Sequence, residues 1–578
     1  MKKRRIEKYP EIIVSATHIY NYMINDHLVD WLRIYKKEVY IRDEFTDYIC
    51  NKGNEFETKL IQYINNNRIQ TEFVSQYITD ETCSKTIELM MQGVPLIHSA
   101  PVRNKFNNTH GIIDLLIRSD YLNRLVEYLP AIDFQADFKA PKLNGDYHYV
   151  VIDIKFSSLK IMADGKHLLN IGKQPAYKGQ VKIYTDAIGA IQGYTSPYGF
   201  IMGRKYVYTR ENRTENNCLY SLGIIDYSSV DRDYNYSTRE AIQWVRLVKG
   251  EGSQWSISPP SRKELYPNMC IESGAWMPEK RRIAEEIKEI TLIWNCGIKN
   301  RNIAIQNQIC SWDNQNCTPT FIGINNSYTT AINSILMINR QTENNIEPQS
   351  NSLIQNNFSN WKTKENEIFV DFETISDIFT DLVDLPLENT TERLFMIGVG
   401  FINNEGVFEY KNFICNQLTS QEEKRILSEF LEWLEERENP KIFYWSAEPS
   451  IWFRAIKRNN ISNSKNIKWC DLYRLFKTEP IVIRGCLDYS LKSVAKAMKK
   501  HNMINCSIED NTCNSGMLAM LHAWKYYNSE GGDLEIMNSI SLYNQFDCKV
   551  LYEILNYLRT YNNQIETQSV FIDEKTID

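Results

Sequence analysis

Apolar residues in the last third of the chain fall into short blocks that have two different spacings. Blocks of strand length, rich in aliphatic and aromatic residues, predict buried strands; they are IFVDFETI (368–375), LFMIGVGFI (394–402) and KIFYWSA (441–447). Apolar residues at helical spacing predict helices over 420–438, 451–459 and 542–558. Ser420 and Glu423 have the spacing of a capping box at the start of the first helix. Strands that alternate with helices predict an α/β domain over 367–578.

The first part of the chain, about 1–260, mixes the same two patterns. Helical spacing of apolar residues predicts helices over 15–35 and 179–191. The β-branched runs HGIIDLLIRS (110–119) and HYVVIDIKFSS (148–158) predict buried strands. Residues 209–260 are polar and rich in turn formers, which predicts an excursion from the domain.

Two further segments, one with helical spacing and one polar, lie between these two parts. Residues 261–340 are predicted to form a helical connector, with two helix-like runs within 279–309 on either side of NCGIKN. Residues 341–366 are polar, rich in Asn and poor in apolar periodicity, so we expect the main linker there. The whole pattern predicts an α/β protein with two main domains.

Length and composition limit the class of protein. A chain of 578 residues is too long for one hydrophobic core, so roughly two to four domains are expected. No apolar run approaches the ~20 residues of a membrane helix, so no membrane partner is expected. The start MKKRRIEKYPEII is basic, but Glu7, Lys8 and Pro10 stand where a signal peptide needs its apolar stretch. The KKRR run is interpreted as a solvated tail, with a nuclear address as the alternative.

Cysteine spacing and net charge limit the kinds of metal site, cellular location and nucleic-acid binding that are expected. The 13 cysteines include no Cys-x-x-Cys pair, and Cys310/Cys317 has neither a zinc nor an iron–sulfur spacing. We therefore expect reduced thiols, an intracellular location in the cytoplasm or nucleus, and no iron–sulfur cluster. A net charge of −6 argues against a broad basic coat that grips nucleic acid by charge alone. It does not exclude an enzyme that meets phosphates with local basic patches and bound metal.

Acidic residues interrupt the apolar blocks of the last part. A strand period of two places Asp371 and Glu373 on one face, where two buried carboxylates repel each other unless a cation lies between them. Oxygen ligands suit Mg²⁺ or Mn²⁺. Tyr543 and Asp547 lie four apart on one helical face, so Asp547 is a further candidate ligand and Tyr543 a residue that positions water. Glu448 follows a strand end, where α/β domains place their ligands.

These residues occur in an order that resembles the DnaQ-like (DEDD) exonucleases of the ribonuclease H-like fold. The resemblance covers about 367–560 and is nearest to the branch fused to RecB-like nucleases; its blocks are YWSAE (444–448), CDLYRLF (470–476), DYSLKSVAKAM (488–498) and YNQFD (543–547). It implies four metal ligands, with Glu448 at the second motif, where most members use Asp. Asp471 and Asp488 are the rivals for that place. Lys492 and Lys496 are candidate phosphate contacts, or simply solvated lysines.

A second set of acidic residues lies in the first part. Asp153 and Lys155 share one face of a predicted strand, and Asp114 lies on the strand before it. Such a carboxylate can bind metal while the Lys positions or deprotonates water. Glu57 faces inward from a helix, and Gln180 and Tyr184 lie four apart on another helix; His98 is either a further member or a structural histidine.

This second set resembles the PD-(D/E)xK fold of RecB-like nucleases over about 10–205. The matching motifs are Gly-x-x-x-Glu (53–57), Gly-Ile-Ile-Asp (111–114), Asp-Ile-Lys (153–155) and Gln-x-x-x-Tyr (180–184). The resemblance implies that Glu57, Asp114 and Asp153 hold metal and that Lys155 assists the nucleophile. Gln180 and Tyr184 would then orient the substrate or the site.

The connector resembles the segment between these two modules in fused proteins. Its helix–turn–helix shape around NCGIKN is similar to a helix–hairpin–helix, which binds DNA backbone through turn amides. The turn lacks a second glycine, so ordinary helical packing is the favoured interpretation. The candidate phosphate contacts here are Arg281, Arg282, Lys299 and Arg301.

Together the two resemblances imply a metal-dependent nuclease with two modules, each with a two-ion Mg²⁺ or Mn²⁺ site. The last part is expected to be a 3′→5′ exonuclease, and the first to cleave DNA ends or flaps in repair or recombination. No Gly-x-x-x-x-Gly-Lys-Ser/Thr motif occurs, so a helicase would act as a partner in trans. The alternatives are an RNA exonuclease and a nucleic-acid-binding scaffold with one inactive module; DNA is favoured over RNA.

Overall fold

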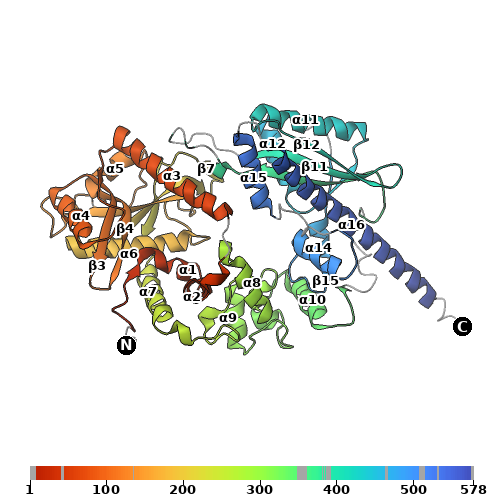
Figure 1. The fold of residues 1–578 in the computed structure, drawn as a ribbon, viewed down its shortest axis with the longest axis horizontal. Coiled ribbons are helices and arrows are strands. Elements are labelled where there is room, and N and C mark those ends of the chain that lie inside the picture. The colour runs from red at the N-terminus through yellow and green to blue at the C-terminus, as the bar shows by residue number, and fades with distance from the viewer. Residues whose placement is uncertain are drawn as a thin grey trace. The chain divides into compact units, whose positions relative to one another are not determined.

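The computed structural model describes residues 8–40, 44–134, 136–347, 361–379, 382, 385, 392–462, 467–506, 515–529 and 533–573, with side chains up to residue 561. The chain divides into two compact units (Figure 1). Unit 1 comprises Met1–Ile287 and Asp381–Thr390, and unit 2 comprises Lys288–Thr380 and Thr391–Asp578.

Unit 1 is built on one mixed sheet. Its strands are β1 (Val14–Ser15), β2 (Glu72–Phe73), β3 (Leu96–Asn104), β4 (Thr109–Arg118), β5 (Tyr149–Ile161), β6 (Tyr198–Tyr208), β7 (Arg213–Glu215) and β8 (Gly223–Asp226). They follow the order β2-β3-β4-β5-β6-β7, with β1 beside β4 and β8 beside β6. The long neighbours β3, β4 and β5 pair antiparallel, whereas β5 and β6 pair parallel. The predicted strands 110–119 and 148–158 correspond to β4 and β5.

Helices cover both faces of this sheet. They are α1 (Tyr20–Met23), α2 (Leu28–Tyr35), α3 (Glu44–Asn67), α4 (Asp80–Gln92), α5 (Leu122–Leu125), α6 (Gln174–Gln192), α7 (Tyr234–Glu251) and α8 (Met277–Glu286). On β5, Tyr149 and Val151 join the core that holds α6 and α7, whereas Val150 and Ile152 join the core that holds α3. This period of two makes the sheet the middle of three layers.

Two predicted segments of unit 1 are corrected by the structure. The helix expected over 15–35 is broken between α1 and α2, because Asn25 takes a left-handed conformation with φ 60°. The excursion expected over 209–260 contains β7, β8 and the 18-residue helix α7. Ala241, Val245 and Val248 of α7 are buried at helical spacing, but the charged residues among them hid this period in the sequence.

Unit 2 contains a five-stranded sheet in the order β12-β11-β10-β13-β14. Its strands are β10 (Glu367–Ile375), β11 (Arg393–Ile402), β12 (Phe408–Ile414), β13 (Lys441–Tyr444) and β14 (Lys468–Asp471). A separate pair is formed by β9 (Ile346–Glu347) and β15 (Val482–Ile483). The first three strands of the sheet are antiparallel, and β13 and β14 continue it in parallel with β10. All three predicted strands of this part are therefore present, and the α/β prediction is confirmed.

The helices of unit 2 lie against both faces of its sheet. They are α9 (Ile298–Gln306), α10 (Thr329–Arg340), α11 (Ser420–Glu436), α12 (Glu448–Arg458), α13 (Leu472–Thr478), α14 (Leu491–Lys500), α15 (Gly516–Asn528) and α16 (Leu534–Asp573). On β10, Phe372 contacts Phe430 of α11, whereas Phe369 contacts Tyr552 of α16. Odd-numbered residues of β10 therefore face α16, and even-numbered ones face α11.

The cap of α11 is displaced by one residue from the predicted box. Thr419, not Ser420, is the N-cap, and its hydroxyl accepts the N–H of Glu422. Both residues suit a cap, and the sequence alone did not decide between them. Glu423 is instead fully buried, and its carboxylate accepts the N–H of Leu394 and hydrogen bonds from Arg458 and Asn459.

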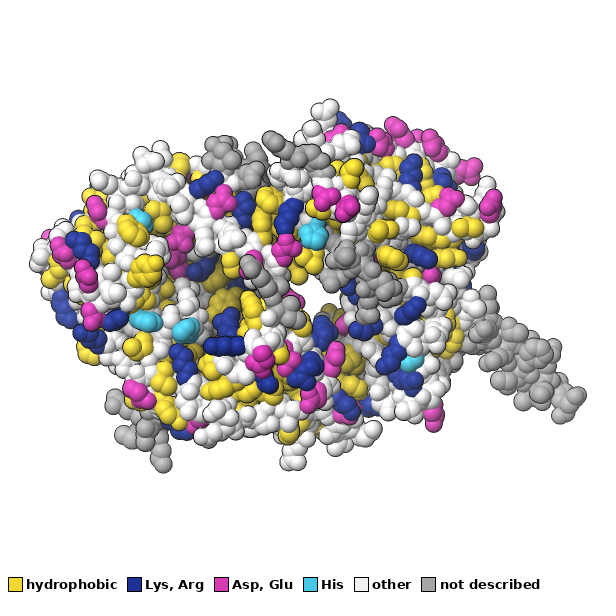
Figure 2. All heavy atoms as spheres, viewed as in Figure 1, with side chains coloured by type: hydrophobic (Ala, Val, Ile, Leu, Met, Phe, Trp, Pro, Cys, Tyr) yellow, Lys and Arg dark blue, Asp and Glu magenta, His cyan; other side chains and the backbone are white. Residues whose placement is uncertain are grey.

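The predicted connector 261–340 is divided between the units. Its first part, with α8, belongs to unit 1, and its second part, with α9 and α10, belongs to unit 2. Of the predicted linker 341–366, residues 348–360 lie outside the described residues. None of the helices in the described part of the chain is long and apolar enough to cross a membrane. On the face shown in Figure 2, basic and acidic side chains are interspersed.

We predict that Glu423→Ala lowers the free energy of unfolding by about 3–5 kcal/mol, because it leaves the half-buried Arg458 without its counter-ion and the buried Asn459 without its acceptor. Ser420→Ala should change it by only about 0.5 kcal/mol or less, as expected for a surface position. Urea unfolding followed by tryptophan fluorescence checks both values. Equal losses in the two variants would contradict the assigned roles.

Candidate functional site

The odd-numbered face of β10 carries the first two candidate ligands of unit 2. Asp371 and Glu373 point to the same side as Phe369, which packs against α16. Their carboxyl groups lie close enough that, after burial, the charge of Glu373 raises the pKa of Asp371. The predicted strand period therefore places both acids toward the helix that holds Asp547.

Asn544 of α16 links these two acids, and sequence reasoning missed this residue. Its side chain is fully buried, and Nδ2 donates to Asp371 Oδ2 at 2.8 Å and to Glu373 Oε1 at 3.4 Å. Oδ1 accepts from the hydroxyl of Tyr410 at 2.9 Å. The signal was present in the YNQFD block, where Asn544 stands between the two residues that were assigned.

A glycine on the neighbouring strand makes room for this amide. Gly398 pairs with Asp371 across β10 and β11, and a Cβ atom there would lie 1.5 Å from Asn544 Oδ1. Any side chain at 398 would therefore push the amide away from both carboxylates. Gly398 is a requirement of this site and not a turn former.

Glu448 comes from the turn between β13 and α12. Ser446 adopts φ 80°, which is unusual for a residue with a side chain and bends the chain sharply before the helix. Glu448 is the first residue of α12 and is buried. Its Oε2 atom, like Oδ1 of Asp547, is buried without a hydrogen-bond partner. Two orphaned carboxylate oxygens from distant segments are therefore left for an external ligand.

The four acids of unit 2 raise one another's pKa values. Burial, followed by the charges of Glu373, Asp547 and Glu448, holds the pKa of Asp371 well above its usual range. Burial raises the pKa of Glu373 to about 7 and that of Glu448 to about 8, and the charge of Asp547 adds to both. Burial also raises the pKa of Asp547 to about 6, although Lys492 and Tyr543 oppose the shift. The charged forms are thus costly without a cation.

Tyr543 and Lys492 lie beside these acids. Burial, followed by the charge of Asp547, raises the pKa of Tyr543. Lys492 Nζ lies 5.1 Å from the centroid of the Tyr543 ring, and its charge acts on Glu373 and Asp547. Lys496 lies one turn further along α14 and is exposed. The structure therefore brings Lys492 to the acids, on the side of the phenol.

The two rivals for the place of Glu448 have other partners. The carboxylate of Asp471 caps α13 by accepting the N–H of Arg474 at 3.0 Å. It therefore holds the start of α13. Asp488 binds the N–H of Ser490 and the hydroxyl of Ser493 at the start of α14.

Unit 1 gathers its candidates around Asp153 of β5. Asp153 has the same parity as Val151, so it lies on the face covered by α6. Lys155 Nζ forms an ion pair with Asp153 Oδ2 at 2.7 Å. From α6, Gln180 donates to Asp153 Oδ1 at 3.3 Å and to the hydroxyl of Tyr184 at 3.1 Å. The predicted pairs of strand and helix thus meet at one place.

Asp114 and Glu57 complete this group through charge. Asp114 Oδ2 accepts the N–H of Ile154 at 2.7 Å, next to Asp153. Burial, followed by the charge of Asp153, raises the pKa of Asp114 well above its usual range. Burial also raises the pKa of Glu57, which the charge of Lys155 opposes. Burial would lower the pKa of Lys155, but Asp153 and Asp114 outweigh it and raise that pKa, so the ammonium stays charged.

The donor sets of both groups suit a hard divalent cation, since they consist of buried and half-buried carboxylates that repel one another. In unit 2, Glu448 Oε2 and Asp547 Oδ1 are buried without a hydrogen-bond partner, so both oxygens are available to a cation. Within the described residues, no three His, Cys, Asp or Glu side chains are arranged so that they could hold one metal ion as they stand. Any metal would therefore draw the carboxylates together.

The remaining candidates are placed apart from these groups. His98 on β3 packs against Phe73 at 5.2 Å, and burial lowers its pKa. Arg301 is buried and pairs with Glu289. Arg282 pairs with Glu279 and Glu286. Arg281 and Lys299 are exposed, in different units.

Comparison with known proteins bears on the second half of the chain. A family model described as the RNase_H superfamily matches residues 378–559. The match begins just after β10 and includes Glu448, Tyr543 and Asp547. No curated protein matches the chain. The C-terminal region therefore contains an RNase H-like domain, which indicates nuclease-type activity, and the RecB-like N-terminal module stays a prediction.

The raised pKa of Glu448 predicts a pH-dependent stability without metal. A carboxyl whose folded pKa is about 8, above its ordinary value of 4.5, stabilises the fold at low pH and loses that contribution as pH rises through about 8. In EDTA, the melting temperature should therefore fall between pH 5 and 9, by about 2–4 °C for each kcal/mol. Glu448→Gln should flatten this profile and raise stability at pH 9. A variant that keeps the wild-type slope would contradict the assignment.

The two roles of Glu448 and Asp471 can be separated by conservative substitution. Asp471→Asn keeps an oxygen that can accept the Arg474 N–H and cap α13, so it should retain most of the thermal stabilisation by Mn²⁺. Glu448→Gln should lose it, since it removes a charged donor. Differential scanning fluorimetry in an Asp153→Asn background, which weakens the unit 1 group, measures the shifts, with Asp488→Asn as control. A loss in Asp471→Asn as large as in Glu448→Gln would make Asp471 the ligand.

Proposed function

We propose that this chain is a metal-dependent nuclease with two catalytic modules that hydrolyse phosphodiester bonds of DNA. The observation that supports it most is the meeting of Asp371, Glu373, Glu448 and Asp547 in unit 2. These acids come from three separate segments, repel one another and leave two buried oxygens without partners. Mutual repulsion of this kind destabilises a fold, and it is typical of a functional site.

In unit 2 the four acids would hold Mg²⁺ or Mn²⁺. When bound, such ions supply positive charge to the attacking water and to the leaving oxygen of the phosphodiester. Tyr543 lies against Asp547 and can orient the attacking water through its hydroxyl, which its raised pKa keeps protonated. Lys492 is placed beside the Tyr543 ring, where its ammonium can meet a phosphate oxygen. We assign 3′→5′ exonuclease activity to this unit.

In unit 1, Asp153, Asp114 and Glu57 would be the ligands. Lys155 remains an ammonium in its ion pair, so it can donate to a phosphate oxygen or position a water molecule. Gln180 and the hydroxyl of Tyr184 fix the orientation of Asp153 from α6. We assign to this unit the cleavage of DNA ends or single-stranded flaps, in DNA repair or recombination.

Substitution of one acid in each unit tests the proposal. Asp371→Ala should abolish release of nucleotides from 3′ ends, and Asp153→Ala should abolish cleavage at ends and flaps, with losses of at least about 10²-fold each in kcat/KM because a ligand of the catalytic cation is missing. The measurement uses end-labelled DNA and RNA of matched sequence with Mn²⁺, Mg²⁺ or EDTA. Circular dichroism verifies that the variants remain folded.

Asp488→Ala serves as the matched control, since Asp488 binds Ser490 and Ser493 at the start of α14 and belongs to neither group of ligands. It should keep both activities. If Asp371→Ala and Asp153→Ala digest as fast as wild type, both sets of ligands are wrongly assigned. If RNA is degraded faster than DNA, the choice of substrate is wrong while the site assignments stand.

A further inference from the structure

Unit 1 has a shallow pocket outside its carboxylate group, with a volume of about 550 Å³. It lies between the loop that follows β8 and the first two turns of α7. Two guanidinium groups, Arg232 and Arg239, and the ring of Tyr236 line it together with Tyr227. The pocket thus combines positive charge with aromatic surface.

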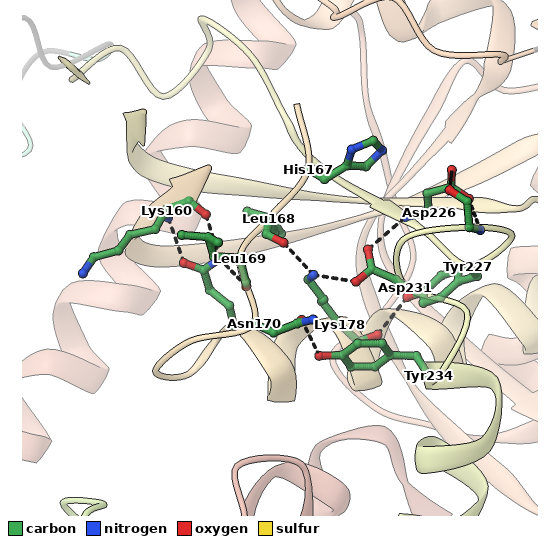
Figure 3. Close-up of polar contacts among 12 residues, drawn as sticks. Lys160, His167, Leu168, Leu169, Asn170, Lys178, Asp226, Tyr227, Asp231 and Tyr234 are labelled. Carbon is green, nitrogen blue, oxygen red and sulfur yellow. Dashed lines mark hydrogen bonds and ion pairs between the residues drawn. The ribbon is translucent and has the colours of Figure 1, made fainter. Parts of the chain in front are cut away.

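A buried ion pair fixes the loop that forms this pocket. Lys178 of α6 and Asp231 are both fully buried, and Lys178 Nζ lies 2.6 Å from Asp231 Oδ1 (Figure 3). Lys178 Nζ also donates to the carbonyl of Leu168 at 2.7 Å, and Asp231 Oδ2 accepts the N–H of Asp226 at 3.1 Å (Figure 3). Both charges are therefore satisfied, and neither is available to a ligand.

Further hydrogen bonds hold both ends of the loop. Asp226 accepts the N–H and hydroxyl groups of Ser228 and Ser229. Asn235 Nδ2 donates to the carbonyls of Tyr227 and Arg232, each at 2.9 Å. A loop fixed in this way loses little conformational entropy when it binds a ligand.

Arg232, Tyr236 and Arg239, which line the pocket, are exposed to solvent. Arg232 and Arg239 are exposed, and within the described residues neither guanidinium has an ion-pair or hydrogen-bond partner. Tyr236 is 70% exposed, and among the aromatic residues of the described part of the chain only Phe106 and Tyr77 are more exposed. The carboxylate of Asp233 also lines the pocket, so two positive charges face one negative charge. The net attraction is for an anion.

We propose that this pocket, here called the strand pocket, binds the backbone of a single nucleic-acid strand, an inference that rests on the proposed nuclease function. Two free guanidiniums can each form paired hydrogen bonds to phosphate oxygens. An exposed tyrosine offers a face on which a base can stack. The strand pocket therefore serves as a non-catalytic contact that retains the substrate.

The position of the strand pocket links it to the candidate catalytic helix. Tyr227, which lines the pocket, donates its hydroxyl hydrogen to the carbonyl of Lys178 at 2.8 Å. Lys178 lies on α6 two residues before Gln180, which contacts Asp153. One helix thus supports the carboxylate group with some of its residues and the strand pocket with others.

Binding of a labelled single-stranded DNA in EDTA, measured by fluorescence anisotropy over a range of salt, tests the inference. The double variant Arg232→Gln/Arg239→Gln should bind about ten-fold or more weakly, and its plot of log K against log salt should be less steep by about 1.4, because two phosphate contacts are lost. Tyr236→Leu should weaken binding without changing that slope, since it removes stacking and no charge.

Arg210→Gln/Lys263→Gln is the matched control, because it removes two exposed positive charges of unit 1 away from the pocket. It should stay near the wild-type affinity and slope. An unchanged slope in the pocket variant, or an equal loss in the control, overturns the strand pocket. If wild type hydrolyses DNA and the pocket variant binds it normally, only this inference fails; if wild type neither binds nor hydrolyses nucleic acid, the proposed function fails first.

Discussion

Repulsion between buried carboxylates is the constraint on which the rest of unit 2 depends. Asp371, Glu373, Glu448 and Asp547 cannot all ionise in an apolar setting unless positive charge lies near them. Without a cation, the raised pKa values of Asp371 and Glu373 favour their protonated forms, and the amide of Asn544 donates to both carboxyl groups. The same constraint explains the glycine at position 398, because a side chain there would occupy the space of the Asn544 amide.

The two units compensate their acids differently. In unit 1, Lys155 supplies a permanent positive charge at 2.7 Å from Asp153, and Gln180 occupies its second oxygen. In unit 2, the charge of Lys492 acts on Glu373 and Asp547, and one oxygen each of Glu448 and Asp547 has no hydrogen-bond partner. An ion pair thus offsets the charge of Asp153 in unit 1, whereas unit 2 leaves two such oxygens for a cation.

Most of the strands and candidate site residues could be predicted from the local spacing of apolar and acidic residues. A period of two placed Asp371 with Glu373 and Asp153 with Lys155, because strand parity is a property of the backbone alone. The start of α11 was wrong by one residue, since Thr419 and Ser420 are equally suited to cap a helix. Asn544 was missed for a different reason. The role of a buried amide depends on its hydrogen-bond partners, and the partners of Asn544, such as Asp371 and Tyr410, come from distant segments of the chain.

Glu448 and Asp471 follow neighbouring parallel strands of unit 2, but their carboxylates have different partners. Glu448 lies just after Ser446, whose φ of 80° is a conformation that a residue with a side chain adopts only under constraint. Asp471, at the end of the neighbouring strand β14, pairs with Tyr444, but its carboxylate accepts the N–H of Arg474 and caps α13. A carboxylate at the end of a strand can therefore resemble a metal ligand in the sequence although it caps a helix in the structure. Hydrogen-bond partners distinguish Asp471, which caps α13, from Glu448, which has a buried oxygen without a partner.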